Sequence, residues 1–149
     1  MPNFSIEEEI NSPVIGLDEV GRGPLAGPVI SCGCHFKNYT IINDLKDFIG
    51  DSKKLSAKKR ELSFKFLQNL KKEKIIDFHL GIANVEEIDN LNILEATKLS
   101  MKRVVDKFNL SNAQLIIDGN FSLNYKTYKE QSIIKGDNKS LSIAAASII

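Results

Sequence analysis

Alternation of apolar and polar residues predicts five β-strands along the chain. The clearest case is residues 29–36, where every second residue from Ile30 to Phe36 is apolar. A period of two residues is typical of a strand whose two faces meet different surroundings. The same alternation, or a short apolar run, predicts further strands at residues 14–17, 75–82, 113–117 and 131–134.

Helical spacing predicts three helices between and after these strands. Ser56 is a suitable N-cap for a helix that reaches about Lys72. Its predicted buried stripe is Leu62, Phe66 and Leu70. Apolar residues three and four apart predict a second helix over about 94–108, and a run that starts near Ser140 predicts a third. Strands cluster first and later alternate with helices, which favours a mixed sheet covered by helices in a single α/β domain over residues 1–149.

The composition narrows the class of protein without naming a function. The chain has 149 residues, 42% of them hydrophobic and 26% charged, with a formal net charge of +1. No apolar run is long enough to span a membrane, and the acidic start, with Glu7–Glu9 as a solvated segment, is unlike a signal peptide. We therefore expect a cytoplasmic protein. Cys32 and Cys34 form no disulfide framework and no metal-ligand spacing, so we predict that they pack in the core.

Four acidic residues follow apolar strand runs and are the main candidates for chemistry. They are Asp18, Glu19, Asp118 and Asp137. Catalytic groups gather at the carboxyl ends of strands in open sheets with helical connections. Carboxylates that lie close together repel each other unless protons or cations bridge them, and hard oxygen ligands suit Mg²⁺ or Mn²⁺. The alternative for each residue is an ordinary turn or helix cap.

A glycine-rich segment follows the first strand. Residues 21–27 match the dinucleotide-binding pattern formally, but Pro24 and Pro28 interrupt the segment and a strand follows it, whereas that pattern must open a helix. Exposed amides of Gly21 and Gly23 can instead approach a phosphate or sugar, and Arg22 adds a planar fork of donors. The alternative is a tight connection between two strands.

A cluster of basic residues is a second feature that could bind a polyanionic partner. Residues 51–61 contain Lys53, Lys54, Lys58, Lys59 and Arg60. This run could track a nucleic-acid backbone, or it could be a solvated helix face. Two further lysines, Lys135 and Lys139, flank Asp137. No Cys or Ser pattern accompanies His35 or His79, so we assign neither of them to catalysis.

Several segments, in the right order, resemble ribonuclease HII. The first, residues 16–29, is the most specific, and together the segments extend from about residue 13 to the end of the chain. They read GLDEVGRGPLAGPV (16–29), DSKKLS (51–56), IDNLNILEAT (88–97), IDGN (117–120), KGD (135–137) and IAAASI (143–148).

The resemblance implies a ribonuclease H-like fold with a mixed five-stranded sheet. It implies hydrolysis of RNA in RNA–DNA hybrids and nicking of DNA on the 5′ side of an embedded ribonucleotide, leaving 3′-hydroxyl and 5′-phosphate ends. Two divalent ions, Mg²⁺ or Mn²⁺, would be held by the catalytic acids, which map onto Asp18, Glu19, Asp118 and Asp137. Substrate contacts map onto Gly21, Arg22, Gly23, Ser52, Lys53, Lys54, Lys139 and Ser140. We expect a monomer.

The family continues beyond the segment that ends this chain, so we expect residues 1–149 to lack its C-terminal helices and a tyrosine that stacks on the sugar at the junction. The alternative for the end of the chain is a short terminal helix docked on the sheet. Two other functions remain open at this stage. A fragment that binds hybrid duplexes without cleaving them would shift a gel but leave no nick. A small cofactor-binding domain would respond to a nicotinamide or flavin.

Overall fold

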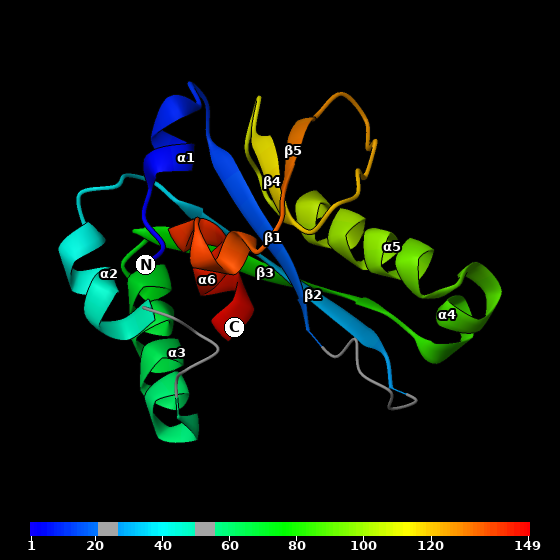
Figure 1. The fold of residues 1–149 in the computed structure, drawn as a ribbon, viewed down its shortest axis with the longest axis horizontal. Helices are drawn as coiled ribbons and strands as arrows, with labels where there is room; N and C mark the ends of the chain where they lie inside the picture. Colours follow the sequence, from blue (N-terminus) through cyan, green and yellow to red (C-terminus); the bar gives the residue numbers. More distant parts are fainter. Residues whose placement is uncertain (21–26, 50–55) are drawn as a thin grey trace.

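Five strands pair edge to edge in the order β3-β2-β1-β4-β5. In the computed structural model, which describes residues 1–20, 27–49 and 56–149, the strands run antiparallel between β1, β2 and β3 and parallel between β1, β4 and β5. The predicted mixed sheet of five strands is therefore confirmed (Figure 1). The strands are β1 (Val14–Val20), β2 (Val29–Phe36), β3 (Ile76–Ala83), β4 (Gln114–Asp118) and β5 (Lys129–Ile133).

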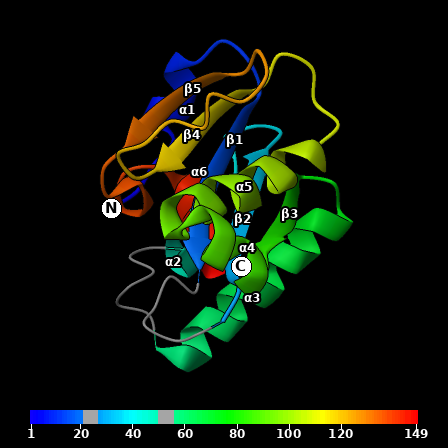
Figure 2. The ribbon, with the colours of Figure 1, turned by 90° about the vertical axis from the view of Figure 1, so that its right-hand side faces the viewer.

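Helices cover both faces of this sheet (Figures 1 and 2). One face packs against α2, α3 and α6, and the other packs against α5, with α4 beside its start. The helices are α1 (Ser5–Glu9), α2 (Ile42–Ile49), α3 (Ala57–Lys72), α4 (Val85–Leu91), α5 (Ile93–Asp106) and α6 (Leu141–Ile148), with a 3₁₀ turn, η2, at Gly136–Asn138. Among the described residues, no helix has both the length and the apolar character required to cross a membrane.

Strand β2 lies between the two helical layers and shows how the core divides. Cys32 and Cys34 are fully buried towards α3 and α6, so their predicted core position is confirmed. Gly33 faces the other layer, where a Cβ would lie 2.6 Å from a methyl group of Val104 on α5. Because glycine leaves that space free, α5 packs directly against the sheet.

The predicted helix 56–72 forms, but its buried stripe differs from the prediction. Ser56 caps α3 by accepting a hydrogen bond from the Lys59 amide at 3.2 Å. Leu62, predicted to be buried, is 49% exposed, so that prediction is wrong. The neighbouring Ser63 faces inward instead, because its hydroxyl donates to the Phe48 carbonyl at the end of α2. The packing of α2, an element not predicted, sets the rotation of α3.

The N-terminal acidic segment is only partly solvated. Glu8 and Glu9 are exposed, but Glu7 is fully buried, so the prediction of a solvated segment is wrong for Glu7. Its Oε2 accepts hydrogen bonds from the Ser140 hydroxyl at 2.8 Å and from the Ser142 amide at 3.0 Å. These donors replace part of the water that a carboxylate loses on burial, because among the described residues nothing donates to Oε1.

Candidate active site

Two aspartates meet where the parallel strands β1 and β4 end. The register pairs Leu17 with Ile117, so Asp18 and Asp118 are the next residues along each strand. Asp18 is only 8% exposed, and its carboxyl group donates a hydrogen bond to that of Asp118. The sequence-based expectation that these two residues meet is therefore confirmed by the geometry.

Burial and neighbouring negative charges raise the pKa of both aspartates. For Asp18 the largest cause is burial, followed by the negative charges of Asp118 and Glu19. For Asp118 burial again raises the pKa, and the charges of Asp137 and Glu19 add to this, whereas the hydrogen bonds from the Gly136 amide and from Asp18 lower it. The buried pair therefore retains a proton at neutral pH in the absence of a cation.

Asp137 is carried to this edge by the turn that follows β5. The turn begins with Lys135 in the left-handed region, at a φ of 54°, and the Gly136 amide donates to Asp118 Oδ1 at 2.9 Å. A Cβ on Gly136 would lie 2.6 Å from Ile143 Cδ1 and 3.5 Å from Asp118 Cα, so only glycine fits between them without displacing a neighbour. Asp137 itself is buried, at 4% exposure, and its charge acts on Asp118.

Glu19 completes the acidic group from the strand that also carries Asp18. Its side chain is partly buried, and its backbone amide donates to Asp18 Oδ1 at 2.9 Å. Its negative charge raises the pKa of both aspartates. Asp18, Glu19 and Asp137 thus all act on Asp118, although β1, β4 and the turn after β5 are far apart in sequence.

The donor chemistry of this group fits a divalent cation. In the described part of the chain, no set of three or more His, Cys, Asp or Glu side chains is already drawn together as ligands. Two of the four acids, Asp18 and Asp118, are joined by a hydrogen bond. Their raised pKa values report a crowding of carboxylates that a cation would relieve, and carboxylate oxygens are the ligands that Mg²⁺ and Mn²⁺ prefer.

The predicted substrate contacts are less fully placed. Gly21, Arg22, Gly23, Ser52, Lys53 and Lys54 lie outside the described residues. Lys139 is exposed beside η2. Ser140 is fully buried, and its hydroxyl both donates to Glu7 and accepts from the Ile143 amide, which makes it the N-cap of α6. A phosphate contact by Ser140 remains a prediction, and it requires the hydroxyl to exchange one of these partners.

The predicted basic run continues on α3, and both histidines have structural partners. Lys58 and Lys59 are exposed in the first turn of α3.

His35 Nδ1 lies 2.9 Å from the Val14 carbonyl, and His79 Nε2 lies 3.0 Å from Asp77 Oδ2. Each histidine thus has a hydrogen-bond partner, and the expectation that neither serves the chemistry stays a prediction.

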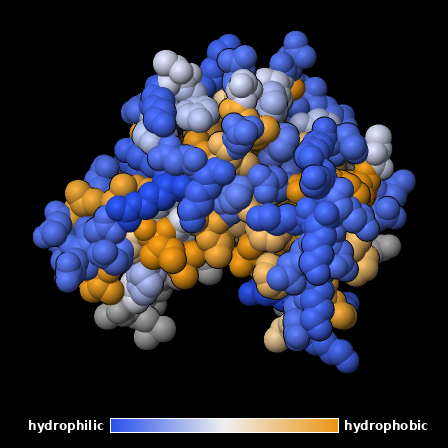
Figure 3. Space-filling view, turned by 180° about the vertical axis from the view of Figure 1, so that it is seen from behind, coloured by the Kyte–Doolittle hydropathy of each residue, from blue (hydrophilic) through white to orange (hydrophobic). Residues whose placement is uncertain are grey.

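Exposed apolar side chains flank the edge that carries the carboxylates. Strand β3 runs in the same direction as β1, because β2 is antiparallel to both, so β3 and the helix that follows it lead to the same edge. Figure 3 shows apolar surface gathered in the middle and lower part of the rear face. The exposed apolar residues of β3, α4 and the first turn of α5 are Leu80, Ile82, Val85, Leu91, Ile93 and Leu94.

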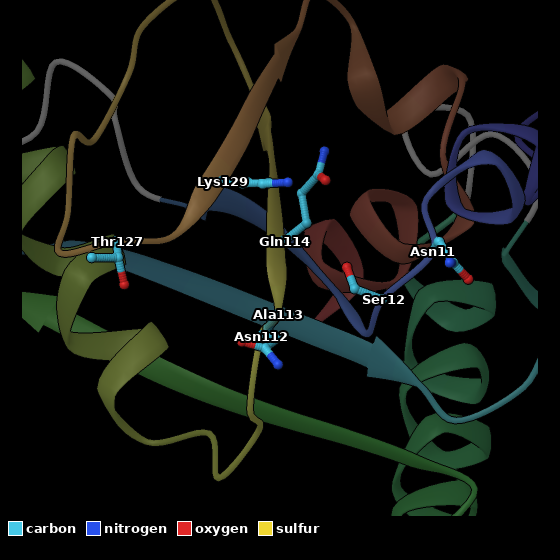
Figure 4. A pocket seen from close by; sticks show the side chains of 7 residues that line it. All are labelled: Asn11, Ser12, Asn112, Ala113, Gln114, Thr127 and Lys129. Carbon is cyan, nitrogen blue, oxygen red and sulfur yellow. The ribbon is translucent and has the colours of Figure 1, made fainter.

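A polar pocket of about 360 Å³ lies at the opposite edge of the sheet (Figure 4). Gln114 and Lys129, the first residues of β4 and β5, line it together with Ser12 before β1. Because Asp18 and Asp118 lie at the carboxyl ends of these strands, this pocket is separate from the acidic group. Sequence reasoning identified neither this pocket nor the buried Glu7, since neither has a motif.

Comparisons with known proteins agree with this arrangement. The family model "Ribonuclease HII" matches residues 15–149. A ribonuclease HII from Wolbachia pipientis subsp. Culex pipiens is 46% identical over 149 aligned residues, which cover 99% of this chain and 71% of the relative.

Two solved structures share the fold. The ribonuclease H2 from Pyrococcus horikoshii OT3 has a TM-score of 0.71 at 25% identity, covering 91% of this chain and 69% of its own. Bst-RNase HIII, solved in complex with Mn²⁺, has a TM-score of 0.71 at 18% identity, covering 100% of this chain and 54% of its own. This chain therefore spans only part of the length of each relative. It has the ribonuclease H-like fold, and it belongs to the ribonuclease HII family, a family of metal-dependent endoribonucleases.

Proposed function

We propose that this chain hydrolyses the RNA strand of RNA–DNA hybrids and nicks DNA on the 5′ side of an embedded ribonucleotide, leaving 3′-hydroxyl and 5′-phosphate ends. The observation that carries the proposal is the pair Asp18 and Asp118, with Glu19 close enough to raise the pKa of both and Asp137 close enough to raise that of Asp118. Membership of the ribonuclease HII family supports the same reaction class. We further propose that residues 1–149 act as one catalytic domain and as a monomer.

Asp18 and Asp118 are the residues that would hold the two divalent cations. Glu19 and Asp137 would complete the sites, with Asp137 on the side of the attacking water. When bound, such ions lower the pKa of a water molecule and stabilise the departing 3′ oxygen. The chain itself contributes fixed, converging carboxylates, because strand register and the Gly136 amide hold Asp118 in place. Either Mg²⁺ or Mn²⁺ suits these oxygen donors.

Discrimination of RNA from DNA is assigned to the segment after β1. Gly21, Arg22 and Gly23 follow the strand that carries Asp18 and Glu19, so the chain leads directly from the acidic group to these three residues. The 2′-hydroxyl is the group that separates RNA from DNA at one nucleotide. We assign contacts with the duplex backbone to Ser52, Lys53, Lys54 and Lys139, with Ser140 beside them.

Cleavage of a DNA duplex with a single ribonucleotide tests this function. The wild-type chain is incubated with Mg²⁺ or Mn²⁺ beside Asp118→Asn and Asp89→Asn. Asp89 is exposed on α4 and provides a control with the same change of charge. We expect a nick on the 5′ side of the ribonucleotide from wild type and Asp89→Asn, and a loss of about 100-fold or more in Asp118→Asn.

Circular dichroism confirms that each variant is folded before the assay. A folded wild-type chain that leaves the duplex intact with either metal would contradict the proposal. So would cleavage by Asp118→Asn at the wild-type rate. A band shift without a nick would instead identify a chain that binds hybrids without cleaving them.

A further inference from the structure

We propose that Glu7 is a positioning residue that fixes Asp137 beside Asp118, and so sets the affinity of the acidic group for divalent cations. The inference rests on the proposed metal-dependent function and adds a residue that lies outside the four acids. Glu7 comes from the N-terminal helix α1, whereas Asp137 lies in the turn before α6.

The N-terminal segment docks on the turn that carries Asp137. Asn3 forms a parallel bridge with Ser140: its amide donates to the Lys139 carbonyl at 3.3 Å, and its carbonyl accepts from the Leu141 amide at 2.9 Å. Phe4 is buried against Phe36 of β2, with ring centroids 5.0 Å apart. Backbone and side-chain contacts therefore fix the segment on both sides of its entry into α1.

Glu7 connects the N-terminal segment to the start of α6. Its Oε2 accepts from the Ser140 hydroxyl and from the Ser142 amide, residues that follow Asp137 by three and five positions. Glu7 is fully buried, and among the described residues no cation pairs with it. A buried carboxylate is costly unless donors compensate for lost water, and the amino end of a helix supplies such donors.

The same turn is held from its other side by Asp118. The Ser140 amide donates to the Gly136 carbonyl at 2.8 Å, and the Gly136 amide donates to Asp118 Oδ1 at 2.9 Å. A continuous set of hydrogen bonds thus runs from Glu7 through Ser140 and Gly136 to Asp118. Asp137 lies within this set, between Gly136 and Ser140.

The first turn of α6 packs closely against β1, near Asp18. A Cβ on Gly16 of β1 would lie 2.7 Å from the Ser142 backbone, so the first turn of α6 rests directly on the strand two residues before Asp18. A small rotation of that turn would therefore move Asp137 relative to Asp18. Groups that orient metal ligands from outside typically change metal affinity or activity by about 10- to 100-fold when they are removed.

The test compares Glu7→Ala and Glu7→Gln with Glu8→Ala, a control one residue away on the exposed side of α1. Mn²⁺ affinity is measured by titration calorimetry on residues 1–149, and kcat and KM are measured on the ribonucleotide duplex. We expect Glu7→Ala to weaken Mn²⁺ binding and lower kcat by about 10-fold or more, with KM for the duplex unchanged. Glu7→Gln should restore both values, because the amide oxygen can accept the same two hydrogen bonds.

A second control separates positioning from a general loss of stability. Ile76→Val removes a buried methylene from β3, away from the turn, and should lower stability without changing Mn²⁺ affinity. The proposal is overturned if Glu7→Ala binds Mn²⁺ as Glu8→Ala does, or if Glu7→Gln is as impaired as Glu7→Ala. Wild-type protein that binds Mn²⁺ but leaves no nick would refute the proposed reaction alone, since the affinities still decide the role of Glu7. Failure of wild type to bind Mn²⁺ would overturn both.

Discussion

Asp18 and Asp118 show that a group of residues suited to bind cations destabilises the fold when no cation is bound. Both side chains are removed from water and lie against another negative charge, and their pKa values rise as a result. Ordinary surface aspartates have a pKa of about 3.9 and cost nothing at neutral pH. The acidic group therefore stores repulsion that only a proton or a cation relieves.

The first prediction concerns the metal-free chain. A carboxyl group with a raised pKa in the folded state stabilises the fold below its unfolded pKa of about 3.9, and this contribution is lost as the pH rises towards the folded value. Asp118→Asn removes one charge and keeps an oxygen that accepts from Gly136. Because Asp118 is only half-buried, solvent limits the gain, and we expect the Tm to rise by about 2–4 °C.

Thermal melts in EDTA at about pH 8 and about pH 4 check this sign. The gain should be present at the higher pH and shrink at the lower one, where wild type is also protonated. A lower Tm for Asp118→Asn at the higher pH would show that the carboxylate stabilises the fold instead.

The second prediction concerns the two cysteines of β2. Burial raises the pKa of the Cys32 thiol to about 12 and raises that of Cys34 well above its ordinary value. Because the thiolate is the reactive form, neither residue should react with a disulfide reagent such as DTNB in the folded chain. Both should react in guanidinium chloride. Rapid labelling of the native protein would contradict their placement in the core.

At the scale of elements, sequence patterns located the strands better than the short helices. The predicted strand 29–36 has the same bounds as β2, because both of its faces are packed and alternation is strong. Helices α1, α2 and α4 were not predicted, since each has at most eight residues and forms through tertiary packing rather than a long periodic pattern. The exposed Leu62 shows the same limit, because contacts of α3 with α2, β3 and α6 together fix which side of that helix is buried.

The acidic group could be predicted from the pattern of strands. The contact of Glu7 with Ser140, which supports that group, could not. Asp18 and Asp118 each follow an apolar strand run, and parallel strands bring such residues together at one edge. Glu7 has no such signal. Its partner Ser140 lies 133 residues away, and the contact depends on how α1 docks against α6. Long-range contacts of this kind follow from the whole fold and not from a local pattern.

The third prediction tests the packing of α5 on the sheet. A Cβ on Gly81 of β3 would overlap the Ser100 carbonyl oxygen and lie 2.8 Å from the Val104 amide nitrogen. Backbone atoms cannot turn aside as a side chain does, so Gly81→Ala must separate β3 from α5. We expect a loss of about 1–3 kcal/mol in unfolding free energy.

Gly27→Ala is the matched control, because none of the described residues has an atom within 4 Å of the Cβ it would add. Urea denaturation of both variants and wild type measures the difference. Equal midpoints for Gly81→Ala and Gly27→Ala would show that β3 and α5 are less tightly packed than this structure indicates.

At the scale of the whole molecule, the acidic group joins elements from both halves of the chain. Asp18 comes from β1, Asp118 from β4 and Asp137 from the turn after β5, so the group is assembled only when the sheet is complete. A cation that binds these residues therefore binds the folded chain and not the unfolded one. Binding of this kind stabilises the fold in proportion to the logarithm of the ligand concentration.

The last prediction follows from this linkage. At a free Mn²⁺ concentration about 100 times its Kd, the fold should gain about 2.7 kcal/mol, which for a chain of this size raises the Tm by about 5–10 °C. Asp18→Asn should lose most of this shift, and Asp89→Asn should keep it, because Asp89 is exposed on α4. Differential scanning calorimetry with and without Mn²⁺, and again after EDTA, measures the effect. An equal shift in all three proteins would place the bound cation elsewhere, and the repulsion between Asp18 and Asp118 would then have no relief except a proton.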